Sequence, residues 1–219
     1  MDPVMSSNQA NHTTNAAPER AGKRPRSAQT SGPQAHESLL RAAAELFYRE
    51  GVRAVGVDAV VERAGVNKMS LYRQFSSKDD LVIAYLDRAD AAFFARFDAS
   101  IAQHPGDAAR QLKQYFDDLT GRASAPAYRG CPFVNVAAEF PDPGHPARVW
   151  VEQHKAKLMA RLTELTTAAG AEDPTALANA LALLIEGVYA ASQTYGAGCG
   201  PIQVAAQVAG QLIDAACGS

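Results

Sequence analysis

Apolar residues recur at every third or fourth position along most of the chain, which is the spacing of an α-helix that buries one face. Gly, Pro, Ser and Asp interrupt this pattern at intervals, and these residue types end one helix or begin the next. The pattern predicts helices over residues 36–50, 57–64, 67–75, 77–103, 107–121, 132–140, 146–169, 174–195 and 202–217. We therefore expect an all-α protein.

Two of the predicted helices are short and are joined by a tight turn. The first, Val57–Ala64, follows Gly56, which is an acceptable N-cap. A turn at Gly65 leads into the basic and aromatic helix Asn67–Phe75. At a rise of roughly 1.5 Å per residue this helix is about 13 Å long, close to the roughly 12 Å width of the B-DNA major groove. The pair predicts a helix-turn-helix, although a helical hairpin in an ordinary bundle would show the same pattern.

The two sides of the helix Asn67–Phe75 differ in character. A rotation of about 100° per residue puts Leu71 and Phe75 on one side. The other side carries Met69, Ser70, Tyr72 and Arg73. We expect the apolar pair to anchor the helix in a core and the other side to face solvent.

The flanking segments complete a three-helix unit. Residues 36–50 have apolar positions at helical spacing, and Gly51 follows as a C-terminal cap. Ser77 is a suitable N-cap for the next helix, with Asp79 and Asp80 in its first turn. Lys78 is placed where a DNA phosphate could lie.

Five ordered fragments match a known family. They are Ala44-Glu45-Leu46-Phe47, Glu50-Gly51, Glu62-Arg63-Ala64-Gly65-Val66, Leu71-Tyr72-Arg73-Gln74-Phe75 and Ser77-Lys78-Asp79-Asp80-Leu81. With this order and spacing, the chain from Ala42 to Leu81 resembles the DNA-binding domain of TetR-like transcriptional repressors. The resemblance implies a homodimer that binds a palindromic operator and releases it when a small molecule binds the C-terminal domain.

The resemblance also implies roles for individual residues. Lys68, Ser70, Tyr72 and Arg73 lie where the family contacts DNA, Lys78 lies where it holds a backbone phosphate, and we include Met69 in the expected surface. The sequence departs from the family at two of its positions. Gly56 replaces a Ser or Thr that usually contacts phosphate, and Arg73 replaces a frequent His while keeping a positive charge.

The last two predicted helices are apolar over much of their circumference. On residues 174–195 a second stripe consists of Ala180, Leu183, Gly187 and Ala190. A helix of this kind must be covered on two sides, so the two helices form either the four-helix dimer interface that the resemblance implies or part of one subunit's core. Glu186 and Asp214 interrupt the apolar runs, which argues against membrane spans.

A small-molecule site between the C-terminal helices would need aromatic walls and a few polar groups that orient the guest. The candidates are Tyr115, Phe116, Phe133, Asn135, Glu139, Phe140, Trp150, His154 and Tyr189. Aromatic residues at these positions suit a plain helical core equally well.

Composition and charge agree with a sequence-specific DNA-binding protein. The chain has 219 residues, of which 47% are hydrophobic, so it can bury a sizeable core. Its formal charge of −2 is unevenly distributed, because residues 1–86 hold 11 Lys and Arg against 9 Asp and Glu. The basic excess at the N-terminal end favours DNA contact there. A protein that coats DNA regardless of sequence would need many more basic residues.

The first 35 residues lack an apolar run and are expected to form a disordered basic tail. Its basic cluster, Arg20, Lys23, Arg24 and Arg26, suits either a minor-groove arm or an ordinary solvated tail. No signal peptide or membrane anchor is visible. Together with only three Cys, this predicts a cytoplasmic protein without disulfides.

Two other functions remain open at this point. Cys131 precedes a predicted helix start, where a thiol pKa tends to fall, so it suits a thiol-based sensor as well as a buried turn residue. A helical metal-dependent enzyme would use His145, Glu152 and His154, but their spacing matches no common metal motif. Cys131 and His154 as nucleophile and base would lack a recognisable oxyanion site. We expect no catalysis, no cofactor and no resident metal.

The predicted organisation is a disordered tail over residues 1–35, a helix-turn-helix DNA-binding domain over 36–80, and a helical regulatory and dimerisation domain over 81–219. The predicted function is a ligand-responsive transcriptional repressor. A transcriptional activator needs the same groove contact and is the nearest alternative.

Overall fold

The computed structural model describes residues 32–218, which form helices and contain no strand. The helices are α1 (Gly32–Glu50), α2 (Val57–Ala64), α3 (Lys68–Gln74), α4 (Lys78–Ile101), α5 (Ala108–Ala123), α6 (Pro132–Glu139), α7 (Pro146–Ala168), α8 (Pro174–Thr194) and α9 (Gly200–Cys217). The all-α prediction is confirmed, and every predicted helix is present with small differences at its ends.

Side-chain caps account for several helix starts. Ser77 Oγ accepts a hydrogen bond from Asp80 N at 3.0 Å at the start of α4. Asp107 and Asp173 cap α5 and α8 in the same way. Each cap satisfies a backbone N–H that lacks a partner in the first turn, so the helix starts are fixed by residues visible in the sequence.

The first helix begins earlier than predicted. Residues 32–35 belong to α1, and Ala35 is buried, so the expected disordered tail was too long at its C-terminal end. The rest of that tail, including Arg20, Lys23, Arg24 and Arg26, lies outside the described residues.

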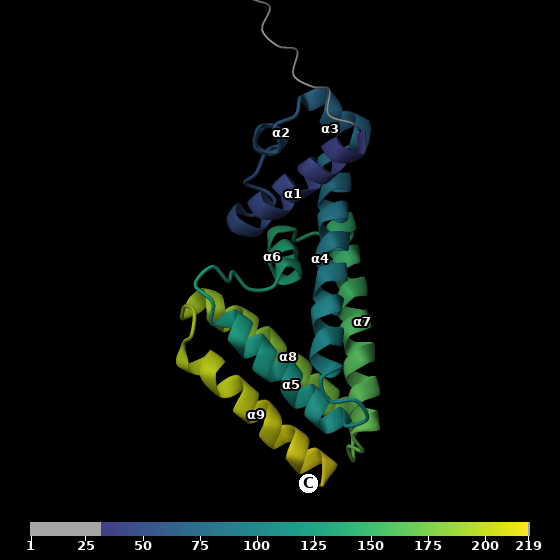
Figure 1. Cartoon of the computed structure of the whole chain (residues 1–219), viewed down its shortest axis with the longest axis vertical. Coiled ribbons are helices and arrows are strands. Elements are labelled where there is room, and N and C mark those ends of the chain that lie inside the picture. Colours follow the sequence, from purple (N-terminus) through teal and green to yellow (C-terminus); the bar gives the residue numbers. More distant parts are fainter. Residues whose placement is uncertain (1–31, 219) are drawn as a thin grey trace, which may run out of the picture.

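Helices α1, α2 and α3 form one end of the molecule, which we call the head (Figure 1). The 24-residue α4 starts in the head and runs alongside α7, while α5, α8 and α9 pack together at the other end. The short α6 lies between the head and these helices. A straight helix of this length spans about 36 Å, so α4 connects the head mechanically to the rest of the protein.

Helix α8 is long and apolar over much of its circumference, as the sequence predicts. By length and composition α8 could cross a membrane, and it is the one such helix within residues 32–218. It packs against α7 and α9, and Leu181 and Ile185 are fully buried by these contacts. This is the environment of a core helix in a helical bundle.

Candidate DNA-binding surface and ligand cavity

The turn between α2 and α3 has the backbone geometry that its sequence requires. Gly65 caps α2 with φ 66°, a left-handed conformation that glycine adopts without a Cβ clash. Asn67 then caps α3 because its Oδ1 accepts hydrogen bonds from Ser70 N at 2.8 Å and Ser70 Oγ at 3.0 Å. Gly56 caps α2 without a side-chain hydrogen bond. The predicted helix-turn-helix is therefore present.

Buried residues hold α3 in the head. Leu71 is 0% exposed and Phe75 is 5% exposed, as expected for the anchoring pair. Phe75 stacks on His36 of α1, with 4.9 Å between the ring centroids. The Glu45 carboxylate of α1 accepts a hydrogen bond from Arg63 Nε of α2 at 3.1 Å. These contacts fix the direction in which the opposite face of α3 points.

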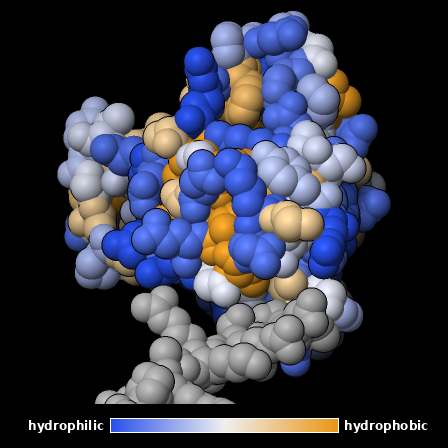
Figure 2. Space-filling view, turned by 90° about the horizontal axis from the view of Figure 1, so that it is seen from above, coloured by the Kyte–Doolittle hydropathy of each residue, from blue (hydrophilic) through white to orange (hydrophobic). Residues whose placement is uncertain are grey.

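The opposite face of α3 is largely exposed. Met69 is 67% exposed, Tyr72 is 50% exposed, and Arg73 is exposed without an ion pair to any described residue. Lys68 is also exposed, but its Nζ lies 2.8 Å from Asp58 Oδ1 of α2. Seen from the head end, the surface is largely hydrophilic (Figure 2). The geometry permits this face to enter a groove of DNA.

Two other predicted DNA contacts, Lys78 and Ser70, are less exposed than Met69 and Tyr72. Lys78 is half-buried in the first turn of α4, with no ion-pair partner within residues 32–218. The Ser70 hydroxyl is already engaged with Asn67. Asp58 and Asn67 therefore orient Lys68 and Ser70, a feature that the sequence reading missed.

The head is attached to the rest of the chain through Glu139, at the C-terminal end of α6. Its Oε1 accepts a hydrogen bond from Val52 N at 3.0 Å and its Oε2 accepts one from Arg53 N at 2.6 Å. Gly51 has φ 94°, and a Cβ there would lie 3.0 Å from Glu139 Oε1. Glycine at this position therefore allows both the turn after α1 and the approach of the carboxylate. We call this contact the Glu139 clamp.

A second attachment joins α1 to the segment before α6. Tyr48 Oη accepts a hydrogen bond from Arg129 N at 2.8 Å and donates one to Gly130 O at 3.1 Å. The Arg129 guanidinium donates to Tyr48 O at 2.8 Å. Both ends of α6 are thus connected to the head.

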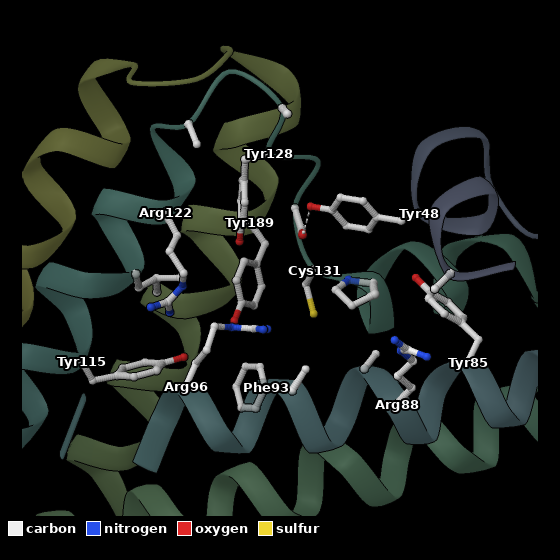
Figure 3. Close-up of a pocket in the computed structure, with 18 residues that line it drawn as sticks. Tyr48, Tyr85, Arg88, Phe93, Arg96, Tyr115, Arg122, Tyr128, Cys131 and Tyr189 are labelled. Carbon is white, nitrogen blue, oxygen red and sulfur yellow. Dashed lines mark hydrogen bonds between the residues drawn. The ribbon is translucent and has the colours of Figure 1, made fainter. Parts of the chain in front are cut away.

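A cavity of about 600 Å³ lies between α1, α4, α5, α8 and the segment before α6 (Figure 3). Its wall contains six aromatic residues, three arginines and several alanines but, within the described residues, no carboxylate. The aromatic and basic members are Tyr48, Tyr85, Arg88, Phe93, Arg96, Tyr115, Arg122, Tyr128 and Tyr189. A cavity of this size and lining suits one drug-sized organic molecule.

Burial raises the pKa of four tyrosine hydroxyls in the cavity wall. Desolvation raises the pKa of Tyr115 to about 12 and raises the pKa of Tyr189 well above its usual value. Burial also raises the pKa of Tyr85 and Tyr128. These hydroxyls are therefore protonated at neutral pH and can donate hydrogen bonds to a ligand.

Only two of the predicted ligand residues border this cavity. Tyr115 and Tyr189 line the cavity, but Phe116, Phe133, Asn135, Glu139, Phe140, Trp150 and His154 do not. Phe133 stacks on His154, Phe140 stacks on His145, and Phe116 is fully buried in the core. Asn135 bonds Arg129 O and Gln193, and Trp150 Nε1 donates to Asp87. Each of these side chains is occupied by packing or hydrogen bonding within the protein.

The sequence reading missed the residues that α1 and α4 contribute to the cavity. One stripe of α4 lines the cavity. It consists of Tyr85, Arg88, Ala89, Phe93 and Arg96. Arginines and alanines within an otherwise apolar stripe were the available signal, because a tightly packed core rarely includes arginine.

His154 is a buried residue of α7 that pairs with an acid. Its Nδ1 lies 2.7 Å from Asp90 Oδ1, and Lys157 Nζ lies 3.1 Å from Asp90 Oδ2. Burial lowers the pKa of His154, although Asp90 opposes this effect. No group of three potential metal ligands exists among the described residues.

We expect the His154 ring to titrate below pH 6.5, its ordinary value, in a histidine NMR titration of the folded protein. The unfolded chain would take up this proton near pH 6.5, so this residue's contribution to stability is present above that pH and is lost as the pH falls below it. Asp90→Asn should lower the His154 pKa further, because it removes the opposing charge. A His154 pKa above 6.5 would contradict the dominant effect of burial.

Cys131 differs from the expectation for a sensor thiol. The N–H groups of Phe133 and Val134 and the charge of Lys155 lower its pKa, but burial outweighs them and the pKa is raised. Its side chain lines the cavity and the residue is 2% exposed. The expected fall in thiol pKa was wrong, because the helix start is buried.

The outer faces of α8 and α9 carry exposed apolar residues. Leu183 of α8 is 74% exposed, and Val204 and Leu212 of α9 are 49% and 36% exposed. The two helices pack against each other, so these faces belong to one end of the molecule.

Known proteins are similar to this chain both in the head and in the helices that follow it. The family model for bacterial regulatory proteins, tetR family, matches residues 39–85. The transcriptional regulator AcuR of Cereibacter sphaeroides is 32% identical over 166 residues, which cover 70% of this chain and 74% of that protein. The transcriptional activator FasR of Mycolicibacterium smegmatis is 40% identical over 79 residues, only 36% of its length.

A solved structure agrees over most of the chain. SCO4454 of Streptomyces coelicolor, a TetR-family transcriptional regulator, superposes with a TM-score of 0.75 at 32% identity. The match covers 84% of this chain and 95% of that one. The match therefore includes helices beyond the head as well as the head itself. The chain belongs to the TetR family of DNA-binding transcriptional regulators, which are not enzymes.

Proposed function

We propose that this protein is a cytoplasmic homodimeric repressor that binds a palindromic operator and releases it when a small molecule fills the cavity. The observation that carries the proposal is the exposed face of α3, where Tyr72 and Arg73 have no partner in the core. In a dimer the two α3 helices would enter successive major grooves, roughly 34 Å apart. Residues 36–80 would form the DNA-binding domain and residues 81–219 the regulatory and dimerisation domain.

The contact residues divide by their chemistry. Tyr72 and Lys78 would contact phosphates and position the head, because one is a long hydroxyl donor and the other a cation at a helix start. Arg73, Lys68 and Ser70 would reach base edges, with Met69 adding apolar contact. Lys68 would have to exchange part of its ion pair with Asp58 for DNA.

The cavity provides a route from ligand to DNA. Ala44 and Tyr48 of α1 form part of its wall, as do Gly130, Cys131 and Pro132 immediately before and at the start of α6. The other end of α6 carries the Glu139 clamp on the head. A ligand that favours a shifted α6 would therefore favour a shifted head, and the two α3 helices would no longer match the operator spacing.

A ligand can release the operator only if it binds the released conformation of the protein much more tightly than the DNA-bound conformation. To convert a mostly bound population into a mostly free one, the ligand must favour the released conformation by roughly a thousandfold to ten-thousandfold. Because FasR is named an activator, a promoter–reporter assay is the test of direction. Higher expression without the protein supports a repressor, and lower expression supports an activator.

We expect Arg73→Ala to weaken operator binding by about 1–3 kcal/mol, because it removes an exposed cation of α3 without touching the core. The operator would first be selected from random duplexes, and affinity would then be measured by mobility shift at a fixed salt concentration. Arg110→Ala is the matched control, since Arg110 is an exposed arginine of α5 far along the chain from the head. Equal affinities for wild type and Arg73→Ala would contradict the placement of α3 in the groove.

A further inference from the structure

Two of the three arginines of the cavity have no acidic partner among the described residues. The third, Arg88, pairs with Glu37, whose Oε1 lies 2.7 Å from its Nη1. The guanidinium groups of Arg96, which is exposed, and Arg122, which is half-buried, form no ion pair or hydrogen bond with any residue in the described part of the chain. Both line a wall without carboxylates, so the cavity carries positive charge that no described acid neutralises.

The two arginines act on Tyr115 from different helices. The charges of Arg122 and Arg96 both lower the pKa of Tyr115, and Arg96 has the same effect on Tyr48. Figure 3 shows the guanidinium groups of Arg96, from α4, and Arg122, from α5, at the end of the cavity near the hydroxyls of Tyr115 and Tyr189. Charges on two helices therefore converge on one region.

Tyr115 adds a second, independent observation. The residue is 1% exposed, and its hydroxyl lies close enough to the Tyr189 hydroxyl for each group to shift the pKa of the other. The two hydroxyls are not well aligned for a hydrogen bond, so the buried Tyr115 hydroxyl is incompletely satisfied within the described residues, which is costly. A ligand oxygen at this end of the cavity would satisfy it.

The rest of the wall is suited to a flat apolar group. Tyr48, Tyr85 and Phe93 present aromatic surface, and Ala44, Ala89 and Ala92 leave room beside it. Aromatic side chains pack favourably against a second ring in stacked or edge-on geometry. Guanidinium groups bind carboxylates with two parallel hydrogen bonds.

We propose that the effector is an aromatic carboxylate whose carboxyl group binds between Arg96, Arg122 and the Tyr115 hydroxyl while its ring lies toward Tyr48 and Phe93. This inference rests on the proposed function and specifies the ligand class for its cavity. The carboxylate replaces water around the two guanidinium groups with charge-assisted hydrogen bonds, and the ring displaces water from the aromatic wall. The aromatic ring of the ligand would contact Tyr48 of α1, so a bound ligand would touch the head directly.

The test compares acids with neutral molecules of the same shape. Benzoate, cinnamate and 2-naphthoate, with benzamide, cinnamamide and 2-naphthamide, would be added to the full chain in thermal-shift and calorimetric titrations. We expect at least one acid to raise the melting temperature and its amide to have little effect, because binding to the folded state alone stabilises it. Amides that stabilise as well as acids, or acids that do not bind at all, would overturn the proposal.

Variants locate the site. Arg96→Gln and Arg122→Gln should each lower the affinity for the stabilising acid by about tenfold to a hundredfold, the loss expected for a hydrogen bond to a charged group. Arg110→Gln, on α5 but paired with Asp107 outside the cavity wall, should bind the acid like wild type. Unchanged acid binding in both cavity variants would overturn the assignment, and melting curves without ligand would verify that each variant folds.

A mobility shift with the selected operator separates the two proposals. A protein that binds the operator but ignores every carboxylate would refute the ligand class alone. A protein that selects no palindromic duplex, whatever its carboxylate binding, would refute the regulatory function itself.

Discussion

Replacing Leu183 with glutamate should convert the dimer that we propose into monomers and lower operator affinity by about a hundredfold to ten-thousandfold. Leu183 is 74% exposed on α8, beside the exposed Gly187 and Ala190. In a two-fold interface the same patch meets its copy, so each new carboxylate would be buried near the other or against apolar surface. Operator affinity would fall because one head binds one half-site, which removes the effective concentration that links the two.

Because Leu183 is exposed in the single subunit, its substitution tests the dimer interface without disturbing the core. A glutamate at position 183 would meet solvent in a single subunit, so the monomer should fold normally. Val149→Glu is the matched control, because Val149 is also an exposed apolar residue, 42% exposed, but lies on α7. Sedimentation velocity would give the oligomeric state and mobility shift the affinity. A Leu183→Glu protein that remains dimeric would show that α8 does not form the interface.

The head could be predicted from the sequence because its determinants are local. Gly65, Asn67 and the pair Leu71 and Phe75 lie within eleven consecutive positions, and each acts through backbone conformation, capping or helical period. The exposed Met69 and Tyr72 followed from the same period. Within this segment, local chemistry and the packing of the head agree.

The cavity could not be predicted in the same way, because its wall is assembled from distant segments. Tyr48, Arg96, Cys131 and Tyr189 come from α1, α4, the start of α6 and α8. Periodicity identifies a buried face but does not distinguish a face that packs from one that borders a void. Phe133 and Tyr115 are both fully buried aromatic residues of helices, yet Phe133 stacks on His154 whereas Tyr115 lines the cavity.

Glu139 illustrates a different limit of sequence reasoning. A carboxylate at the end of a short helix suggested a polar group for a ligand, but its two oxygens accept hydrogen bonds from backbone N–H groups 86 and 87 positions earlier in the chain. The nearby Gly51 was recognised as a helix cap, and its second role, room for the carboxylate, became visible only in three dimensions. In the structure Glu139 connects α6 to the head.

Glu139→Gln should weaken operator binding by about tenfold to a hundredfold, because it loosens the clamp that would hold the two heads of the proposed dimer at a fixed separation. The amide keeps one acceptor but presents N–H donors to a backbone N–H, so at least one charge-assisted hydrogen bond, worth about 1.5–3 kcal/mol, is lost. Hydrogen exchange at the amides of Val52 and Arg53 should accelerate in parallel, since these amides donate to Glu139. Asp142→Asn makes the same chemical change three residues later, where the carboxylate accepts a hydrogen bond from Gly144 N within its own turn and from no other residue of the range 32–218. If Glu139→Gln left both the exchange rates and the operator affinity at the level of Asp142→Asn, α6 would not be the element that couples the cavity to DNA.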